Sequence, residues 1–294
     1  MIENNIEIDT QQKEMKEISQ EICEDNSKNK KKEKKKITIF GFTIIQILAY
    51  FIIYSIIGFI IETIFGLLTK GVIESRKSFL YGPFCGVYGL GAVVMIIGLQ
   101  KFKKNNYTLF FGGFIIGSVL EYIVSLVGEI MFDIKWWDYS SMPFNINGRV
   151  CVWFSIFWGL LAIYLMTHIN PKVDRLIEKI PKKVLKNFTI ILTIIIFIDF
   201  LLTCFALKMF FVRLVNGYNL DIQGVDKYLE TYTELYEKPE IKEFVDTYFS
   251  NEKMLKAFPN IKVTEKNGNI IWVCDILSDI QPYYFRVFTP KRVK

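Results

Sequence analysis

Two glutamates lie in apolar stretches of the chain within the same local sequence. Residues 56–62 and 115–121 both read I-I-G-x-x-x-E, at an offset of 59 residues. A charged group at the centre of a bilayer costs roughly 2.5–3.5 kcal/mol on insertion scales, and the carboxylates found there commonly bind cations or carry protons. Glu62 and Glu121 are therefore the first candidates for a solute-binding or proton-coupling site.

The flanking sequence extends this match into an internal repeat. A Pro-Phe pair follows the first glutamate after 21 residues and the second after 22. Small and polar residues also recur every four positions, which places them on one helix face where a carboxylate contacts protein and not lipid. These stripes are Tyr54, Gly58, Glu62, Gly66 and Gly113, Gly117, Glu121, Ser125, Glu129. The pattern predicts two repeated helical hairpins. The alternative to a functional role is that each glutamate is a hydrogen-bonding group that only supports helix packing.

The elements that carry these residues are predicted to be membrane spans. Five segments hold only four of the chain's 66 charged side chains, which are Glu62, Glu121, Glu129 and Asp199. These segments are residues 37–68, 78–100, 105–132, 150–169 and 187–207. The mean hydropathy is +0.28. About 20 apolar residues cross a bilayer as a helix, so the sequence excludes a soluble enzyme, a disulfide-rich secreted domain and a disordered chain. We expect an all-α polytopic membrane protein with about five transmembrane helices.

Charge bias gives an expected orientation and three domains. Sixteen Lys and Arg residues lie near the N-terminus and the second and fourth loops, against seven near the other loops and the tail. The positive-inside rule then places the N-terminus in the cytoplasm and the tail outside, and it makes the repeat a parallel one. The expected domains are a charged leader at 1–36, a transmembrane domain at 37–212 and a small soluble α+β domain at 213–294. The first apolar segment begins too late for a signal peptide.

The tail is expected to hold two amphipathic helices, at 224–236 and 238–249, and a β-hairpin. The hairpin joins residues 261–265 to 270–274 through an Asn-Gly turn, and 283–288 is a candidate third strand. Nothing in this segment suggests catalysis.

The first predicted outer loop is rich in glycine and aromatic residues. Such backbone is too irregular for a lipid-exposed helix, so we expect a broken or re-entrant segment buried against protein. The candidate gate residues are Tyr81, Gly82, Pro83, Tyr88 and Gly89.

The second outer loop adds two charged candidates, Asp138 and Arg149. One interpretation is an aromatic belt with a surface ion pair. The other places Arg149 close enough to Glu62 or Glu121 to neutralise one of them.

Metal and disulfide chemistry are not expected. The chain has five cysteines without a C-x-x-C pair, and a single histidine, His168. Cys85 and Cys151 follow the two Pro-Phe pairs, and we expect both to be unpaired, buried thiols. Because the basic excess lies beside the spans, nucleic acid is not an expected partner, whereas the lipid bilayer is.

The loop motifs resemble a known family. These motifs are Y-G-P-F-C-x-x-Y-G-x-G at 81–91, L-E-Y at 120–122, W-W-D-Y-S at 136–140, P-F-N-I-N-G-R-V-C at 143–151 and F-W-G at 157–159. They are similar to those of the putative ABC-transporter permease family, also called putative ABC-transporter type IV, over roughly residues 45–205. Gly86 departs from the proline expected in relatives. The resemblance implies a bacterial membrane protein with a transport role. The chain has no G-x-x-x-x-G-K-[ST] motif, so an ATP-binding-cassette subunit would be a separate chain and no cofactor is expected here.

Three functions remain open at this level. The first is a permease-like protein that binds a small solute or proton at Glu62, Glu121, Asp138, Arg149 and Asp199. The second is a membrane enzyme acting on lipid or cell-wall precursors through Asp138, Glu121 and Arg149. The third is a non-catalytic assembly or sensor subunit. The lack of a Ser- or His-based catalytic arrangement disfavours the second.

Overall fold

The computed structural model describes residues 38–103, 105–132 and 135–289. Its contacts divide the chain into two units, residues 1–44 and 45–294, which are described separately. In the first, β1 (Thr38–Ile39) and β2 (Phe42–Thr43) form a short antiparallel hairpin through Phe40 and Gly41, both with positive φ. The predicted leader at 1–36 lies outside the described residues.

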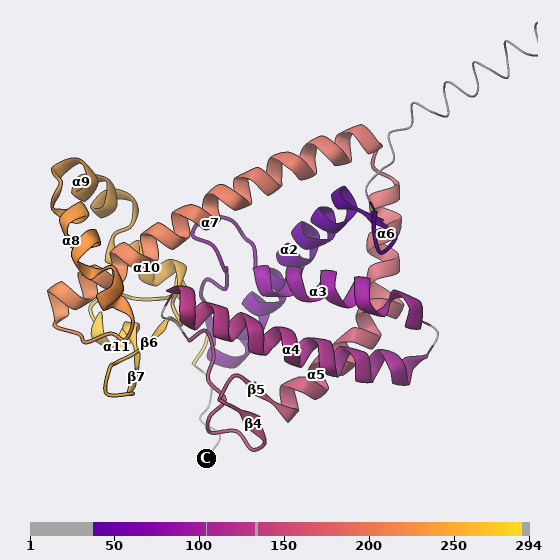
Figure 1. Cartoon of the computed structure of the whole chain (residues 1–294), viewed down its shortest axis with the longest axis horizontal. Coiled ribbons are helices and arrows are strands. Elements are labelled where there is room, and N and C mark those ends of the chain that lie inside the picture. Colours follow the sequence, from indigo (N-terminus) through magenta and orange to yellow (C-terminus); the bar gives the residue numbers. More distant parts are fainter. Residues whose placement is uncertain (1–37, 104, 133–134, 290–294) are drawn as a thin grey trace, which may run out of the picture. The chain divides into compact units, whose positions relative to one another are not determined.

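The second unit is built on four helices that are long and apolar enough to cross a membrane. Three of them are α2 (Ile44–Lys70), α4 (Asn106–Phe132) and α7 (Lys182–Tyr218). The other is a continuous helix from Val152 to Glu178, made of α5 (Val152–Tyr164), the π-helical turn η2 (Leu165–Ile169) and α6 (Asn170–Glu178). Figure 1 shows α4 and α5 lying side by side. The expected class, a mostly helical polytopic membrane protein, is confirmed.

The predicted second span is shorter than the others. It consists of α3 (Gly86–Leu99) and a 3-10 turn, η1 (Gln100–Phe102). At 1.5 Å per residue, 14 helical residues rise only about 21 Å, less than the roughly 30 Å of a hydrocarbon core. Residues 74–85 before it are irregular, and Leu80, Phe84 and Cys85 within them are buried. The structure therefore has an irregular segment buried against protein before a short return helix, in place of a full span.

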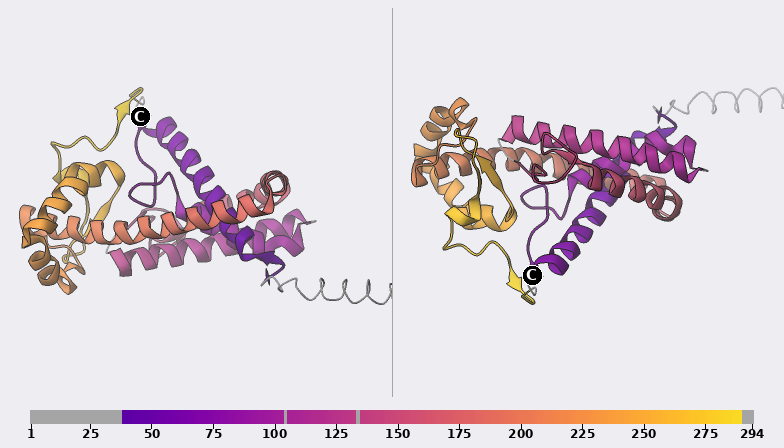
Figure 2. Two further views of the ribbon diagram at one scale, coloured as in Figure 1. Left: turned by 90° about the horizontal axis from the view of Figure 1, so that it is seen from above. Right: turned by 90° about the horizontal axis from the view of Figure 1, so that it is seen from below.

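Helix α7 is one of the four apolar helices, and its last turns continue into the C-terminal domain, as the two views of Figure 2 show. Its last turns, including Phe210 and Phe211, belong to the same hydrophobic core as Phe249 and Phe258 of that domain. The predicted domain boundary at 212/213 thus falls inside a continuous helix. The domain also contains η3 (Val225–Lys227), α8 (Leu229–Glu237), α9 (Pro239–Tyr248), α10 (Asn251–Ala257) and α11 (Val273–Ile276).

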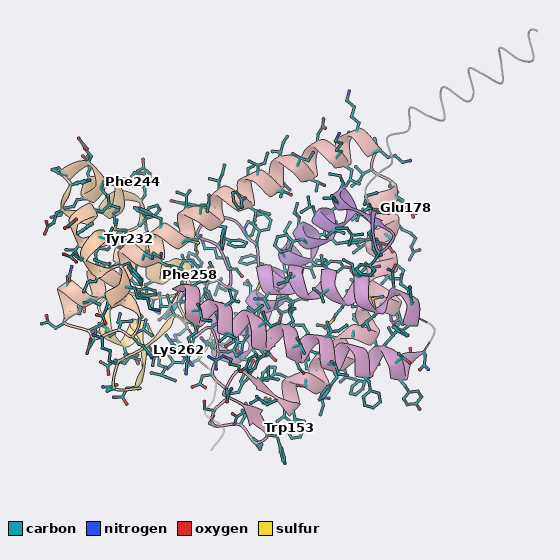
Figure 3. All side chains as sticks on the ribbon, in the orientation of Figure 1. Trp153, Glu178, Tyr232, Phe244, Phe258 and Lys262 are labelled. Atoms are coloured by element: carbon teal, nitrogen blue, oxygen red, sulfur yellow. The ribbon has the colours of Figure 1, made fainter. Side chains whose placement is uncertain are left out.

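The strands of the C-terminal region form two separate pairs. The predicted hairpin is present as β6 (Lys262–Thr264) and β7 (Ile270–Trp272), with Gly268 at positive φ. On β6, Lys262 lies over the ring of Trp272; Figure 3 labels it on the ribbon. The candidate third strand, β8 (Phe285–Arg286), does not join this hairpin, and the backbone of Ile222 and Gln223 lies beside β6.

Instead, β8 pairs with β3 (Val72–Ile73) in the loop after α2. A further hairpin, β4 (Asn145–Ile146) and β5 (Val150–Cys151), precedes α5. Trp136, between α4 and this hairpin, packs against the C-terminal core. The C-terminal domain therefore contacts both of the loops that were predicted to share its side of the membrane.

Candidate functional site

An aromatic side chain lies directly on the glycine of each repeated I-I-G-x-x-x-E segment. A Cβ atom added to Gly58 would lie 2.3 Å from Cβ of Tyr88, and one added to Gly117 would lie 2.4 Å from Cβ of Trp158. No side chain larger than hydrogen fits at either position. In both hairpins the glycine on the first helix makes room for a ring from the second.

The residue after each of these aromatic side chains is a glycine that also packs against the first helix of its hairpin. Gly89 follows Tyr88, and Gly159 follows Trp158. A Cβ atom on Gly89 would lie 2.6 Å from the carbonyl oxygen of Phe51, and one on Gly159 would lie 2.9 Å from that of Phe110. Phe51 and Phe110 are again 59 positions apart, as the repeat predicts.

Glu62, one turn after Gly58, has a cationic partner. Its carboxylate accepts a hydrogen bond from the Tyr88 hydroxyl at 2.7 Å and lies 3.8 Å from Nη1 of Arg76. The Arg76 side chain lies over Gly66, where an added Cβ atom would be 2.9 Å from Nη2. The stripe residue Gly66 thus provides space for the guanidinium that neutralises Glu62.

Glu121, the equivalent residue in the second hairpin, has no such partner. It is 5% exposed, and Oε1 accepts a hydrogen bond from the Tyr139 hydroxyl at 3.0 Å. Trp158 lies beside the same carboxylate. Oε2 is buried, and it and the nearby Trp158 Nε1 do not meet hydrogen-bond geometry with each other or with another described group. Within the part of the chain that the structure describes, no basic side chain forms an ion pair with Glu121. The two repeated carboxylates therefore differ in charge compensation.

Aromatic rings connect the two carboxylates. The rings of Tyr88 and Trp158 lie 6.3 Å apart between their centroids, and Tyr139 stacks on Phe154 at 4.6 Å. Burial raises the pKa of the Tyr139 hydroxyl, and the neighbouring Glu121 carboxylate raises it further. Tyr139 therefore stays protonated and acts as a donor to Glu121.

Arg149 does not neutralise Glu62 or Glu121, so that expectation is wrong. Its guanidinium forms an ion pair with Glu129, two turns after Glu121, and lies 5.6 Å from the centroid of the Tyr122 ring. The contacts of Arg149 are therefore with residues of α4, and its ion pair is near the end of that helix.

Asp138 forms hydrogen bonds within its own loop. Its Oδ1 accepts hydrogen bonds from the backbone and the hydroxyl of Ser140, at 3.1 and 2.6 Å. Although partial burial opposes ionisation, these bonds hold the pKa of Asp138 below its usual range. Gly148, at φ +67°, packs against both residues. Asp138 is therefore an ionised structural carboxylate of the loop.

Asp199 holds the irregular segment that contains three of the candidate gate residues. Its carboxylate, 6% exposed, accepts hydrogen bonds from the backbone N–H of Tyr81 at 3.2 Å and of Gly82 at 2.9 Å. Thr203, one turn later on α7, accepts one from Leu80. Pro83 follows in the same segment, whereas Tyr88 and Gly89 lie on α3 against α2. Asp199 thus ties the segment to α7 and does not join the other carboxylates.

A second polar cluster was not predicted. The Tyr50 hydroxyl donates to Asp174, the Tyr54 hydroxyl donates to Asn170 at 3.0 Å, and the Asn170 amide donates to Asp174 at 3.0 Å. It lies at the other end of α2, beside η2, a π-helical turn of the kind often found at functional sites. Tyr54 is already the first residue of the predicted stripe with Gly58 and Glu62, and Tyr50 lies four residues before it, so the same spacing is the signal that would have found Tyr50.

Cys85 and Cys151 are both free and buried, as expected. Among the described residues, no group of three His, Cys, Asp or Glu is placed to hold a metal ion.

The side chain of Trp153, near the start of α5, is 63% exposed and is labelled in Figure 3.

The helices and the site define a polytopic α-helical membrane protein. The sequence profile of the family described as Putative ABC-transporter type IV matches residues 49–204, more than half of the chain. The protein belongs to this family. Comparisons with curated proteins and with solved structures give no match. The C-terminal domain lies beyond the matched region.

Proposed function

We propose that the protein is a permease-type membrane subunit that binds a small cationic or zwitterionic solute, or a proton, at Glu121. The observation that carries the proposal is the buried Glu121 carboxylate: it has no cationic partner among the described residues, and its Oε2 meets no hydrogen-bond geometry even though the Trp158 indole lies beside it. A buried charge without a partner is costly, so a carboxylate retained in this state is suited to a ligand that brings a proton or a positive charge.

The surroundings of Glu121 support a cationic ligand. Tyr139, which stacks on Phe154, and Trp158 both lie beside the Glu121 carboxylate, so a cation bound there would have aromatic neighbours, and cations are attracted to aromatic rings. Glu62 carries the same repeat position but is already neutralised by Arg76. We assign solute or proton binding to Glu121 and a regulated, secondary role to Glu62.

The family name is the reason to expect a second subunit. It describes an ABC transporter, and a separate ATP-binding-cassette chain would supply ATP hydrolysis. The solute itself is not specified by these residues.

The enzyme alternative is less well supported. Its three residues are held apart in different interactions: Asp138 with Ser140, Glu121 with Tyr139 and Arg149 with Glu129. General acid–base catalysis requires groups that converge on one reacting centre.

Carbodiimide labelling tests the proposal. Dicyclohexylcarbodiimide reacts with carboxyl groups in apolar surroundings, and mass spectrometry identifies the labelled position. We expect Glu121 to be labelled faster than Glu62 and Glu129, which both have arginine partners, and we expect tetramethylammonium or a related small cation to slow the reaction at Glu121. Glu129→Gln is the matched control and should leave this labelling unchanged. Preferential labelling of Glu62 or Glu129, with Glu121 unreactive, would overturn the assignment.

A further inference from the structure

The C-terminal domain holds the loop after α2 at two points. At the first, β8 pairs with β3, and the carbonyl oxygen of Gly71 accepts hydrogen bonds from Val287 at 2.8 Å and Phe288 at 3.1 Å. At the second, Leu80 is part of the hydrophobic core that the C-terminal domain builds with α7. Residues 74–79 are thus fixed from both ends.

A buried carboxylate between these points connects the C-terminal domain to the helices. Glu74 is 6% exposed, and its Oε1 lies 2.9 Å from Nζ of Lys70 and 2.7 Å from Nη2 of Arg76. The Asn260 amide, from the turn between α10 and β6, donates to the same oxygen at 3.2 Å. Asn260 also accepts a hydrogen bond from Lys70 at 2.5 Å. A single side chain of the C-terminal domain therefore completes the shell around Glu74.

Arg76 is the link from Glu74 to the candidate site. Its guanidinium lies between Glu74 and Glu62, in the space that Gly66 leaves open on α2. The closer contact is to Glu74, at 2.7 Å against 3.8 Å, so the position of Arg76 depends on Glu74 more than on Glu62. The contacts that place Glu74 come in part from a domain outside the family match.

We propose that the C-terminal domain is a latch that keeps Arg76 on Glu62. While β8 and Asn260 hold the loop, Glu74 positions Arg76 and the Glu62 carboxylate stays neutralised. Release of the domain lets the loop move and withdraws Arg76, so that Glu62, still bonded to the Tyr88 hydroxyl, becomes a second carboxylate without a cationic partner across the aromatic pair from Glu121. Regulation of the candidate site rests on the proposed function, but the position of Arg76 is measured independently of any solute.

Modification of Arg76 by phenylglyoxal, followed by mass spectrometry of the purified full chain, tests the latch. Asn260→Ala removes the contacts to Glu74 and Lys70, and we expect it to raise the rate at Arg76 several-fold. The rate at Arg149, which pairs with Glu129, is the internal reference and reports whether the fold is retained. Asn267→Ala, in the hairpin turn, is the matched control and should have no effect. An unchanged Arg76 rate in Asn260→Ala would overturn the proposal.

A cross-link gives a second, opposite test. Ile73 and Phe285 are direct partners in the β3–β8 pair, and antiparallel partners lie close enough for a disulfide. In a chain with Ile73→Cys and Phe285→Cys, oxidation should slow modification of Arg76, and reduction should restore it. Equal rates in both forms would show that Arg76 is reached without release of the domain, and the latch would be rejected. Failure of Glu121 to react with carbodiimide would remove the proposed ligand site but leave both arginine results unaffected.

Discussion

Tyr88 and Trp158 contact one another while each lies on the repeat glycine of its own hairpin. Their ring centroids are 6.3 Å apart with the planes at 52°, and an added Cβ atom on Gly58 or Gly117 would overlap the corresponding ring. The Tyr88 hydroxyl reaches Glu62, and Trp158 lies beside Glu121. The two hairpins are therefore joined through an aromatic pair that also contacts both carboxylates.

Replacing either glycine should disturb this contact. Gly58→Ala and Gly117→Ala place a methyl group inside the van der Waals radius of Tyr88 or Trp158, so we expect each to lower stability by about 1–3 kcal/mol, typical of overpacking. The measurement is the thermal transition of the detergent-solubilised protein. Gly217→Ala on α7 has no atom within 4 Å of the added Cβ and should be neutral or stabilising. Similar transitions for all three variants would contradict the close approach.

The sequence was sufficient to locate Gly58 and Gly117, the positions on α2 and α4 against which another helix packs closely. Glycine four residues before glutamate, at an offset of 59, correctly indicated a close helix approach. The partners on the second helices follow an offset of 70. The connection before α5, which includes the β4–β5 hairpin, is longer than that before α3, and Trp158 also lies further along α5 than Tyr88 lies along α3. A search at one fixed offset therefore does not find Tyr88 and Trp158 together.

The ion pairs were harder to predict. Arg76 and Arg149 both lie in loops next to the repeated helices, and sequence distance does not show which carboxylate each one reaches. Loop geometry decides it: the first loop turns back over Gly66, whereas Arg149 meets Glu129 at the end of α4. Hydropathy predicted five spans, whereas the described residues contain four helices long enough to cross a membrane, because the apolar segment at 78–100 contains an irregular stretch and α3 is only 14 residues long.

Asp199→Asn should loosen the irregular segment before α3. Oδ2 accepts from the N–H groups of both Tyr81 and Gly82, so an asparagine oxygen in that place keeps one bond to each. The variant loses the negative charge and the second bond from Tyr81, and its amide N–H groups face backbone donors. Hydrogen bonds to a charged acceptor contribute about 1.5–3 kcal/mol against about 1 kcal/mol for neutral ones, so we expect hydrogen exchange of residues 79–84 to accelerate roughly 10-fold. Thr193→Val, whose hydroxyl bonds within its own helix, is the control. Unaltered exchange in the asparagine variant would mean that other contacts hold the segment.

Tyr139 should make stability depend on alkaline pH. Its folded-state pKa is raised above the unfolded value of about 10, so the unfolded chain releases this proton first as the pH rises. Below about pH 10 the contribution is complete, and above it stability falls by up to about 1.4 kcal/mol per pH unit. We expect Tyr139→Phe to reduce this slope, measured as the thermal transition between pH 9 and 11, about the range in which tyrosine ionises. Tyr107→Phe, at a side chain that is 80% exposed, should keep the wild-type slope.

The last prediction concerns orientation in the membrane. β8 pairs with β3 after α2, and Trp136 after α4 packs against the C-terminal core, so the C-terminal domain shares one side with both loops. The basic residues around the junction of α6 and α7, from Lys172 to Lys186, are expected on the opposite side, and the positive-inside rule predicts that this side is the cytoplasm. We therefore expect Glu240→Cys on α9 to react with a membrane-impermeant maleimide in intact cells, and Lys183→Cys to react only after permeabilisation. Both side chains are exposed, so access to the reagent depends on the side of the membrane. The reverse labelling pattern would show that the lysine bias does not set the orientation of this protein.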